Sequence, residues 1–320
     1  MKNKIKSFFK SVFETKRTKI MFCLAVVSFL LLISVTYAWF VSMIELPHSE
    51  ISTGTLDFVA KAYDENGNYI TTLMGDKEYD DGVNLSMEEF YHQLIDNKIF
   101  PKTSLPSLAK YEDEINELTQ NGDDVIIITI SSKISGTYNF IRLLFEDNPK
   151  VKVIDSCLAV GGIRLLVDEI NKYREKTVEF IVEKVQSLVK RIKIMAIPET
   201  LTYLFRGGRL SKTEWIVGSA LHINPIITFK EGKVKVDCKK RGLRHGMQYI
   251  VESLKRLKCD KNYEIIASYT YDKTNLDKLI SMTDEEYLPQ IKVHDNLDPA
   301  IACHWGPNAF GYIFVTEEEI

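Results

Sequence analysis

Blocks of apolar and polar positions predict strands and helices that follow one another along most of the chain. Residues 125–130 form an unbroken β-branched run, VIIITI, which is long enough for one strand and too short for a helix. A hydroxyl-rich turn follows at 131–137, and apolar positions then recur at helical spacing through Ile141, Leu144 and Phe145. An uninterrupted apolar run is typical of a strand covered on both faces, so this segment predicts a strand, a turn and a helix within an α/β unit.

Two helices are predicted before this strand. The first begins after Ser86, which can cap it, and has two glutamates in its first turn. The second has an apolar face made by Leu108, Tyr111, Ile115 and Leu118. Two prolines bound the loop between these helices, where Thr103, Ser104 and Ser107 gather. A hydroxyl-rich loop of this kind is also typical of simple helix capping.

Alternation of strands and helices continues after the central unit. A short strand at 151–154 ends in Asp155–Ser156, and a long helix follows the glycine pair at 161–162. This order predicts a parallel sheet with right-handed crossovers. Two neighbouring strands that end in hydroxyl or carboxylate turns predict a ligand crevice at their carboxyl ends, where the start of a helix favours an anion.

The turn at 131–137 carries the polar groups for such a crevice. Its hydroxyls, on Ser131, Ser135 and Thr137, can donate to a carboxylate or a phosphate, and Gly136 lets the backbone approach a ligand closely. The simpler alternative is that Ser135 or Thr137 caps the following helix.

The second half of the chain has a different pattern. It predicts a helix at 177–190, a strand at 192–197, a hairpin formed by 225–229 and 233–238, and strands at 263–269 and after the motif HWGPNAFG. Basic residues surround the glycine pair at 207–208, namely Arg206, Arg209 and Lys212. They predict either a solvated basic turn or a docking patch for an acidic partner or a phosphate.

The amino terminus predicts a membrane passage. Residues 20–44 contain no charged residue and exceed the ~20 apolar residues that cross a bilayer. Residues 1–19 carry seven lysines and arginines against one glutamate, so the positive-inside rule predicts a basic cytoplasmic leader and a body outside the cytoplasm. A cleaved signal is the alternative to a signal-anchor helix, because the residues Thr36, Tyr37 and Ala38 fit a cleavage site.

Composition narrows the classes of function. A chain of 320 residues with 45% hydrophobic content can bury one large core or two smaller ones. The formal net charge is −3, and since the leader is basic the remainder is acidic, which argues against a nucleic-acid partner. The five cysteines form no CxxC pair, so free thiols are favoured over a metal site or a disulfide framework. We find no Walker loop and no nucleophile paired with a base, which favours a carrier over an enzyme.

Two short segments near the start resemble TasA/camelysin-type surface proteins. TYAWF at 36–40 is similar to their export segment, and ISTGTLDF at 51–58 is similar to their first strand. The resemblance covers about residues 15–60. We assign residues 45–73 to a short β segment or linker.

Five segments, in order, resemble the DegV family, which comprises the fatty-acid-binding subunits of bacterial fatty acid kinase. They are FPKTSLPS, ISSKISGTY, VIDS, YLFRGGRLS with INPII, and HWGPNAFG. The resemblance implies a two-lobed α/β fold, with a parallel α/β lobe at 74–157 and a second α/β lobe with a mostly antiparallel sheet at 158–320. The family's first strand has no evident counterpart, and residues 51–63 are a candidate for its place in the sheet.

The resemblance also implies a site for one long-chain fatty acid between the lobes, without a further cofactor. It assigns binding of the carboxylate to Thr103, Ser135 and His304. Residues that support the pocket and its turns would be Ser104, Ser131, Gly136, Thr137, Asp155 and Ser156. The arginines Arg206 and Arg209 would lie near the mouth, where they help to dock a separate ATP-binding kinase subunit.

Three functions follow from these patterns. The first is a fatty-acid-binding protein tethered to the membrane. The second is a membrane-anchored structural or adhesion protein with a degenerate DegV-like scaffold. The third is a hydrolase that uses Ser135 with His304, for which no third, orienting group can be named. The family's kinase acts in the cytoplasm, so a cytoplasmic body is the alternative if residues 20–44 do not function as an export segment.

Overall fold

The fold comes from a computed structural model that describes residues 71–74, 77–80, 85–104, 109–218, 223–294 and 297–319. Contacts divide the chain into units 1–53 and 54–320, and every element below belongs to the second unit. The predicted membrane segment at 20–44 and the candidate strand at 51–63 lie outside the described residues. Within the described ranges, no helix has the length and apolarity needed to cross a bilayer.

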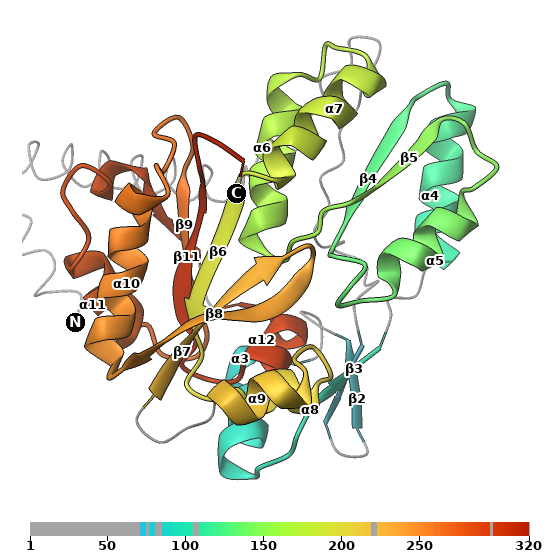
Figure 1. The fold of residues 1–320 in the computed structure, drawn as a ribbon. Helices are drawn as coiled ribbons and strands as arrows, with labels where there is room; N and C mark the ends of the chain where they lie inside the picture. The colour runs from blue at the N-terminus through green and yellow to red at the C-terminus, as the bar shows by residue number, and fades with distance from the viewer. Residues whose placement is uncertain are drawn as a thin grey trace, which may run out of the picture. The chain divides into compact units, whose positions relative to one another are not determined.

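The central strand, turn and helix are present as predicted. Strands β4 (Val125–Thr129) and β5 (Val151–Asp155) pair in parallel, and helices α4 (Ala109–Gln120) and α5 (Thr137–Leu144) accompany them (Figure 1). The expectation that both faces of β4 are covered was wrong, because four of its five residues are only half-buried. In the described part of the chain, the sheet formed by β4 and β5 has two strands.

The second sheet has six strands and is mostly antiparallel, as expected. Only the β10–β9 pair is parallel. In spatial order the strands are β10 (Ile291–Val293), β9 (Ile265–Tyr269), β11 (Phe310–Val315), β6 (Ile192–Ile197), β7 (Ile223–Lys230) and β8 (Lys233–Arg241). The last two form the predicted hairpin.

Helices cover both faces of this sheet (Figure 1). One face packs against α6 (Gly161–Lys172) and α7 (Val178–Val189) through an aliphatic cluster. The other packs against α10 (Leu243–Arg256) and α11 (Thr274–Ser281) through a cluster richer in aromatic residues. Strand β11 supplies alternate side chains to the two clusters, and all its residues are buried. Burial on both faces explains its continuous apolar sequence.

A small third sheet lies beside the carboxyl-terminal helix. It contains β1 (Thr71–Met74), β2 (Lys77–Asp80) and β3 (Lys102–Thr103). In the sequence, helix α3 (Met87–Tyr91) and a π-helical turn, η1 (His92–Asp96), lie between β2 and β3. Ser86 caps α3 as predicted, because its Oγ accepts a hydrogen bond from the Glu89 N–H at 3.1 Å. Phe90 and Leu94 pack against Ala302 of α12 (Pro299–Trp305).

Thr103 lies in strand β3, so the expectation of a loop at this position was wrong. Strand β3 has two residues, and Thr103 pairs with Thr72 of β1. A two-residue strand is too short to produce a detectable alternation of apolar and polar positions.

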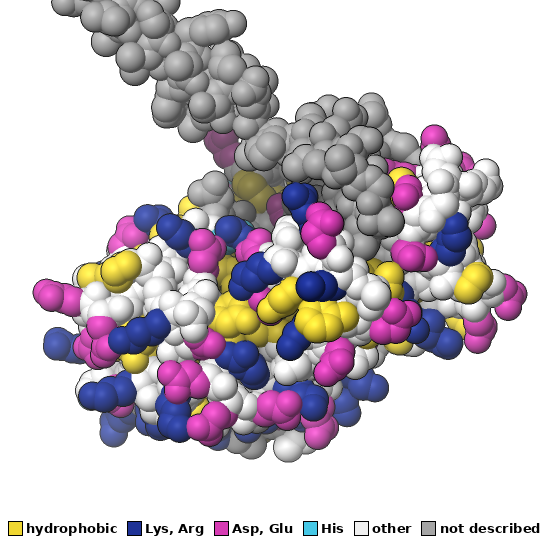
Figure 2. Space-filling model, turned by 90° about the horizontal axis from the view of Figure 1, so that it is seen from above, with side chains coloured by type: hydrophobic (Ala, Val, Ile, Leu, Met, Phe, Trp, Pro, Cys, Tyr) yellow, Lys and Arg dark blue, Asp and Glu magenta, His cyan; other side chains and the backbone are white. Residues whose placement is uncertain are grey.

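Charges of both signs are interspersed on the surface seen in Figure 2, and apolar side chains gather near its middle. Exposed large apolar residues include Phe140 and Leu143 on α5, and Ile216 on α9 (Lys212–Gly218). A mixed charge pattern of this kind produces no strong field of a single sign over that face.

Candidate functional site

One cavity brings together most of the residues that the sequence singled out. It has a volume of about 290 Å³, and its polar lining consists of Thr103, Ser104, Ser135, Gly136, Thr137, Arg209 and His304. These residues come from β3 and the residue after it, from the turn before α5 and its first residue, from the segment after α8 (Thr202–Arg206) and from α12. Apolar walls are added by Leu204, Phe229, Val234, Ile301 and Trp305, among others.

Thr103 and His304 are hydrogen-bonded, although 201 positions separate them in the sequence. The distance between Thr103 Oγ1 and His304 Nε2 is 3.2 Å. His304 is held by helix α12, which our sequence analysis did not predict. The signal was present as Asp298 followed by Pro299, because proline favours the first position of a helix and aspartate favours the position before it.

His304 is kept neutral by its surroundings. Burial, and then the positive charge of Arg209, lower the pKa of its imidazole from 6.5 to about 4. Its Nδ1 is buried without a hydrogen-bond partner among the described residues. Gly207 lies against this atom so closely that a Cβ at position 207 would be 2.3 Å from it. A neutral imidazole has one donor and one acceptor nitrogen, so His304 can bond to a hydroxyl or to a ligand oxygen.

Ser135 and Thr137 form a second polar pair in the cavity. Their hydroxyl oxygens are 2.9 Å apart, and the Thr137 N–H donates to Ser135 Oγ at 3.3 Å. The residue at the N-cap of α5 is Gly136, which has no side chain to cap the helix. The cavity therefore meets the start of α5 with two hydroxyls beside it, an arrangement that favours an anion.

Ser131 supports the turn and does not line the cavity. It is fully buried, and its Oγ donates to the Gly232 carbonyl at 2.7 Å and accepts from the Lys133 N–H at 3.2 Å. Gly232 lies in the β7–β8 turn with a φ of +76°, and a Cβ there would be 2.4 Å from Ser131 Oγ. The bond thus connects the central turn to the hairpin of the second lobe.

Asp155 and Ser156 also act on the backbone. The Asp155 carboxylate accepts the N–H groups of Ser132 at 3.1 Å and Cys157 at 2.9 Å, which ties the turn after β4 to the turn after β5. Ser156 Oγ accepts the Leu158 N–H at 3.0 Å and is buried. These residues position the wall of the cavity without reaching into it.

The two arginines of the RGGR segment have different environments. Arg209 lines the cavity and is half-buried, its Nε donates to the Ile134 carbonyl at 2.9 Å, and burial lowers its pKa. Arg206 is exposed and lies outside the cavity lining, with its guanidinium 4.1 Å from the centre of the Phe100 ring. The interpretation of this segment as a solvated basic turn therefore fits Arg206, which is exposed, but not Arg209, which lines the cavity.

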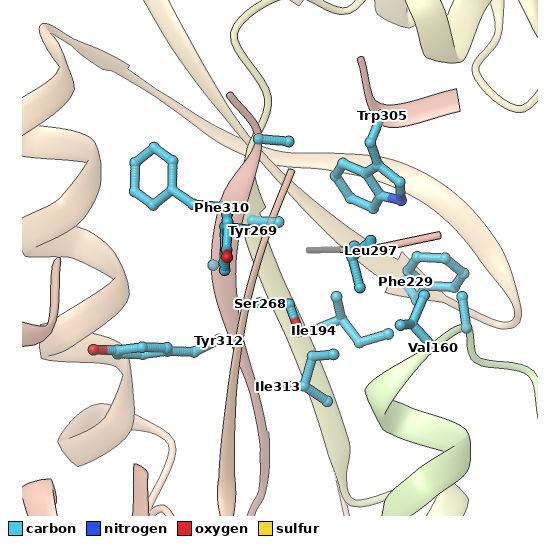
Figure 3. Close-up of a pocket in the computed structure, with 14 residues that line it drawn as sticks. Val160, Ile194, Phe229, Ser268, Tyr269, Leu297, Trp305, Phe310, Tyr312 and Ile313 are labelled. Carbon is cyan, nitrogen blue, oxygen red and sulfur yellow. The ribbon is translucent and has the colours of Figure 1, made fainter. Parts of the chain in front are cut away.

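A smaller, almost wholly apolar cavity adjoins the first one. Its volume is about 40 Å³, and it lies against the six-stranded sheet (Figure 3). Ala159, Phe229 and Trp305 line both cavities. The sequence had not predicted these apolar walls, because they come from segments that pattern alone does not place together.

The geometry does not assemble the hydrolase considered above. Ser135 Oγ is paired with Thr137, and His304 Nε2 is paired with Thr103. In a nucleophile–histidine pair, a third group orients the imidazole through its other nitrogen. In the described part of the chain, His304 Nδ1 has no such partner.

Comparison with known proteins shows that this chain matches one protein family over most of its length. The model of the DegV family, described as a family of uncharacterised proteins, matches residues 55–317. A DegV domain-containing protein from Clostridium acetobutylicum is 32% identical over 268 residues, which cover 80% of this chain and 93% of that protein. The match begins within the predicted linker at 45–73 and leaves the predicted membrane segment outside.

Solved structures show the same fold. The crystal structure of a fatty acid binding DegV family protein from Streptococcus agalactiae is 25% identical with a TM-score of 0.69, covering 83% of this chain and 97% of that one. A stearic acid-binding protein from Eubacterium ventriosum is 26% identical with a TM-score of 0.66, covering 78% and 90% of the two chains. This chain therefore belongs to the DegV family.

Proposed function

We propose that this protein binds a long-chain fatty acid, with the carboxylate and the adjoining part of the acyl chain in the larger cavity and a further part of the chain in the smaller apolar cavity. The observation that carries the proposal is the convergence of the Thr103–His304 pair and the Ser135–Thr137 pair on one cavity. The relatives from Streptococcus agalactiae and Eubacterium ventriosum, described as binding fatty acid and stearic acid, support it.

The polar groups suit a buried carboxylate. A carboxylate that leaves water loses several kcal/mol unless its oxygens are hydrogen-bonded. The hydroxyls of Thr103 and Ser135 can each donate to one oxygen, with His304 and the start of α5 close by. Arg209 adds positive charge at the wall while its Nε remains bonded to Ile134.

The acyl chain supplies most of the affinity in this proposal. Each methylene that leaves water contributes about 0.8 kcal/mol, so a dozen buried methylenes outweigh the gain from a few hydrogen bonds. The head group then fixes the orientation of the ligand. This division of roles fits a carrier, which must hold the carboxyl group in a defined place without reacting with it.

Two further parts of the proposal concern partners. The protein is tethered to a membrane through residues 20–44 with its body outside the cytoplasm, where it binds fatty acid without a kinase. In the alternative, residues 20–44 do not act as an export segment, and the cytoplasmic body presents the bound acid to a separate ATP-binding subunit of a fatty acid kinase, with Arg206 available on the surface for docking. A degenerate structural or adhesion scaffold is the weaker candidate, because such a scaffold has no need to keep the Thr103–His304 and Ser135–Thr137 pairs directed at one cavity.

Ser135→Ala tests the head-group assignment. Removal of one hydrogen bond of about 1 kcal/mol should weaken binding of octadecanoic acid about fivefold while leaving the thermal unfolding temperature unchanged. Ser132→Ala is the matched control, because Ser132 lies in the same turn but does not line the cavity. Binding is measured by titration calorimetry, and native mass spectrometry of the purified chain shows whether one fatty acid is retained.

Unchanged affinity in Ser135→Ala would refute the assignment of the carboxylate to this residue. A folded chain that neither retains nor binds a fatty acid would refute the proposed function itself.

A further inference from the structure

Ser268 is a buried hydroxyl without a hydrogen-bond partner in an otherwise apolar cavity. It lies on β9, its residue is 8% exposed, and its Oγ contacts no polar group of the described residues (Figure 3). Five described residues have a buried side-chain atom without a partner, and two of them line a cavity. Those two are His304, in the larger cavity, and Ser268, in the smaller one.

The strand register explains why there is space beside Ser268. Ala196 of β6, Gly311 of β11 and Ser268 of β9 are directly paired, so their side chains form one row on the same face of the sheet. Three small residues in a row leave a hollow in the sheet surface. All three line the 40 Å³ cavity.

The next row closes the hollow. Two residues further along these strands, Ile194, Ile313 and Ile266 form a row of bulky side chains on the same face. Helix α6 presses on this row, since a Cβ at Gly161 would lie 2.8 Å from Ile266 and 2.9 Å from Ile313. Ser268 therefore lies at the end of the hollow, next to the row formed by Ile194, Ile313 and Ile266.

Ser268 meets a part of the acyl chain that is remote from the carboxylate. None of Thr103, Ser135 and His304 lines the smaller cavity. The two cavities share apolar walls, so a chain whose carboxylate lies in the larger cavity reaches Ser268 with a carbon further along.

A plain hydrocarbon chain would leave the Ser268 hydroxyl buried and unpaired, which is unfavourable. We infer that the protein selects a fatty acid with a hydroxyl group along its chain, and that Ser268 Oγ forms a hydrogen bond with that hydroxyl. The inference rests on the proposed function and specifies its ligand. A site that pairs a ligand hydroxyl discriminates against the analogue without it, because the protein group is then left without a partner. The competing explanation is a bound water, for which the cavity is large enough.

The test uses the full chain with octadecanoic acid and a series of hydroxyoctadecanoic acids that carry one hydroxyl on different carbons. One positional isomer should bind about tenfold more tightly than octadecanoic acid in direct titrations. Ser268→Ala should abolish this ratio and leave the affinity for octadecanoic acid at least as high. Thr228→Val is the matched control, because Thr228 also has a buried hydroxyl without a partner but lines neither cavity. It should keep the ratio.

The possible outcomes test the inferred preference for a hydroxylated acid separately from the proposed fatty acid binding. If octadecanoic acid binds and no isomer binds more tightly, or if Ser268→Ala keeps the preference, the inference is wrong and the proposed function stands. Equal binding of all acids is also the result expected if a water satisfies Ser268. If the folded chain binds none of these acids, both are wrong.

Discussion

Gly207→Ala is expected to damage the ligand site through His304 and not through the fold. Gly207 has helical backbone angles, with a φ of −71°, so alanine meets no backbone strain there. Its added methyl group would instead lie 2.3 Å from His304 Nδ1 and 3.0 Å from the Tyr203 carbonyl oxygen. The side chain that must give way is therefore one that we place against the carboxylate.

The displacement can be worked out from these contacts. The separation between the new Cβ and Nδ1 must grow from 2.3 Å to about 3.4 Å, where ordinary contact begins, a shift of about 1.1 Å. A shift of that size breaks the 3.2 Å hydrogen bond between Thr103 and His304. Leaving a buried polar group unpaired costs about 1–3 kcal/mol, which corresponds to about a 5- to 150-fold loss of fatty acid affinity.

Titration calorimetry with octadecanoic acid measures this loss, and a double-mutant cycle identifies its origin. In a His304→Ala background, Gly207→Ala should have almost no further effect on affinity, because the clashing ring is gone. Gly208→Ala is the control: nothing lies within 4 Å of its Cβ position, so its φ of +77° should lower stability without lowering affinity. Full affinity in Gly207→Ala, or an equal loss in both backgrounds, would refute the reasoning.

The remaining predictions concern charge. Since the pKa of His304 is about 4 in the folded protein and 6.5 without burial, the unfolded chain takes up this proton first as the pH falls, and the unfolding free energy should drop by about 3 kcal/mol between these values. Urea unfolding at several pH values should show this contribution missing in His304→Gln. Arg209→Ala should weaken fatty acid binding, because it removes a half-buried cation from the wall and its bond to Ile134. Arg206→Ala removes only a surface contact with Phe100, so a comparable loss of affinity in that variant would contradict our placement of the site.

Local patterns predicted much of the fold. The β-branched run at 125–130, the cap at Ser86 and the hairpin across Lys230–Glu231–Gly232 were all identified correctly, because each depends on neighbouring residues. Helix α12 and strand β3 were missed. The first has seven residues and the second has two, so neither spans enough positions to show its period.

The chain pattern predicted an anion crevice at the turn 131–137, but the assignment of the carboxylate to Thr103, Ser135 and His304 came only from the family motifs. Periodicity contains no information on which hydroxyl of a turn faces a cavity, so it could not distinguish Ser131 from Ser135. In the structure, Ser131 is buried and hydrogen-bonded to the Gly232 carbonyl, whereas Ser135 lines the cavity. The close packing of Gly207 on His304 was equally invisible, since the two residues are almost a hundred positions apart. The hollow beside Ser268 depends on the register of three strands, which no single strand pattern specifies.

The position of β11 has a consequence for biosynthesis. This strand lies between β9 and β6, yet the ribosome makes it after the other five strands of its sheet. Until it emerges, the nascent chain holds two separate half-sheets, β10–β9 and β6–β7–β8, whose unpaired edges can associate with other chains. The sheet of this lobe is therefore completed only after β11 is made, and its assembly depends on long-range contacts, which form slowly. Premature termination after Gly306 would remove β11 from the middle of the sheet and leave β9 and β6 without a strand between them.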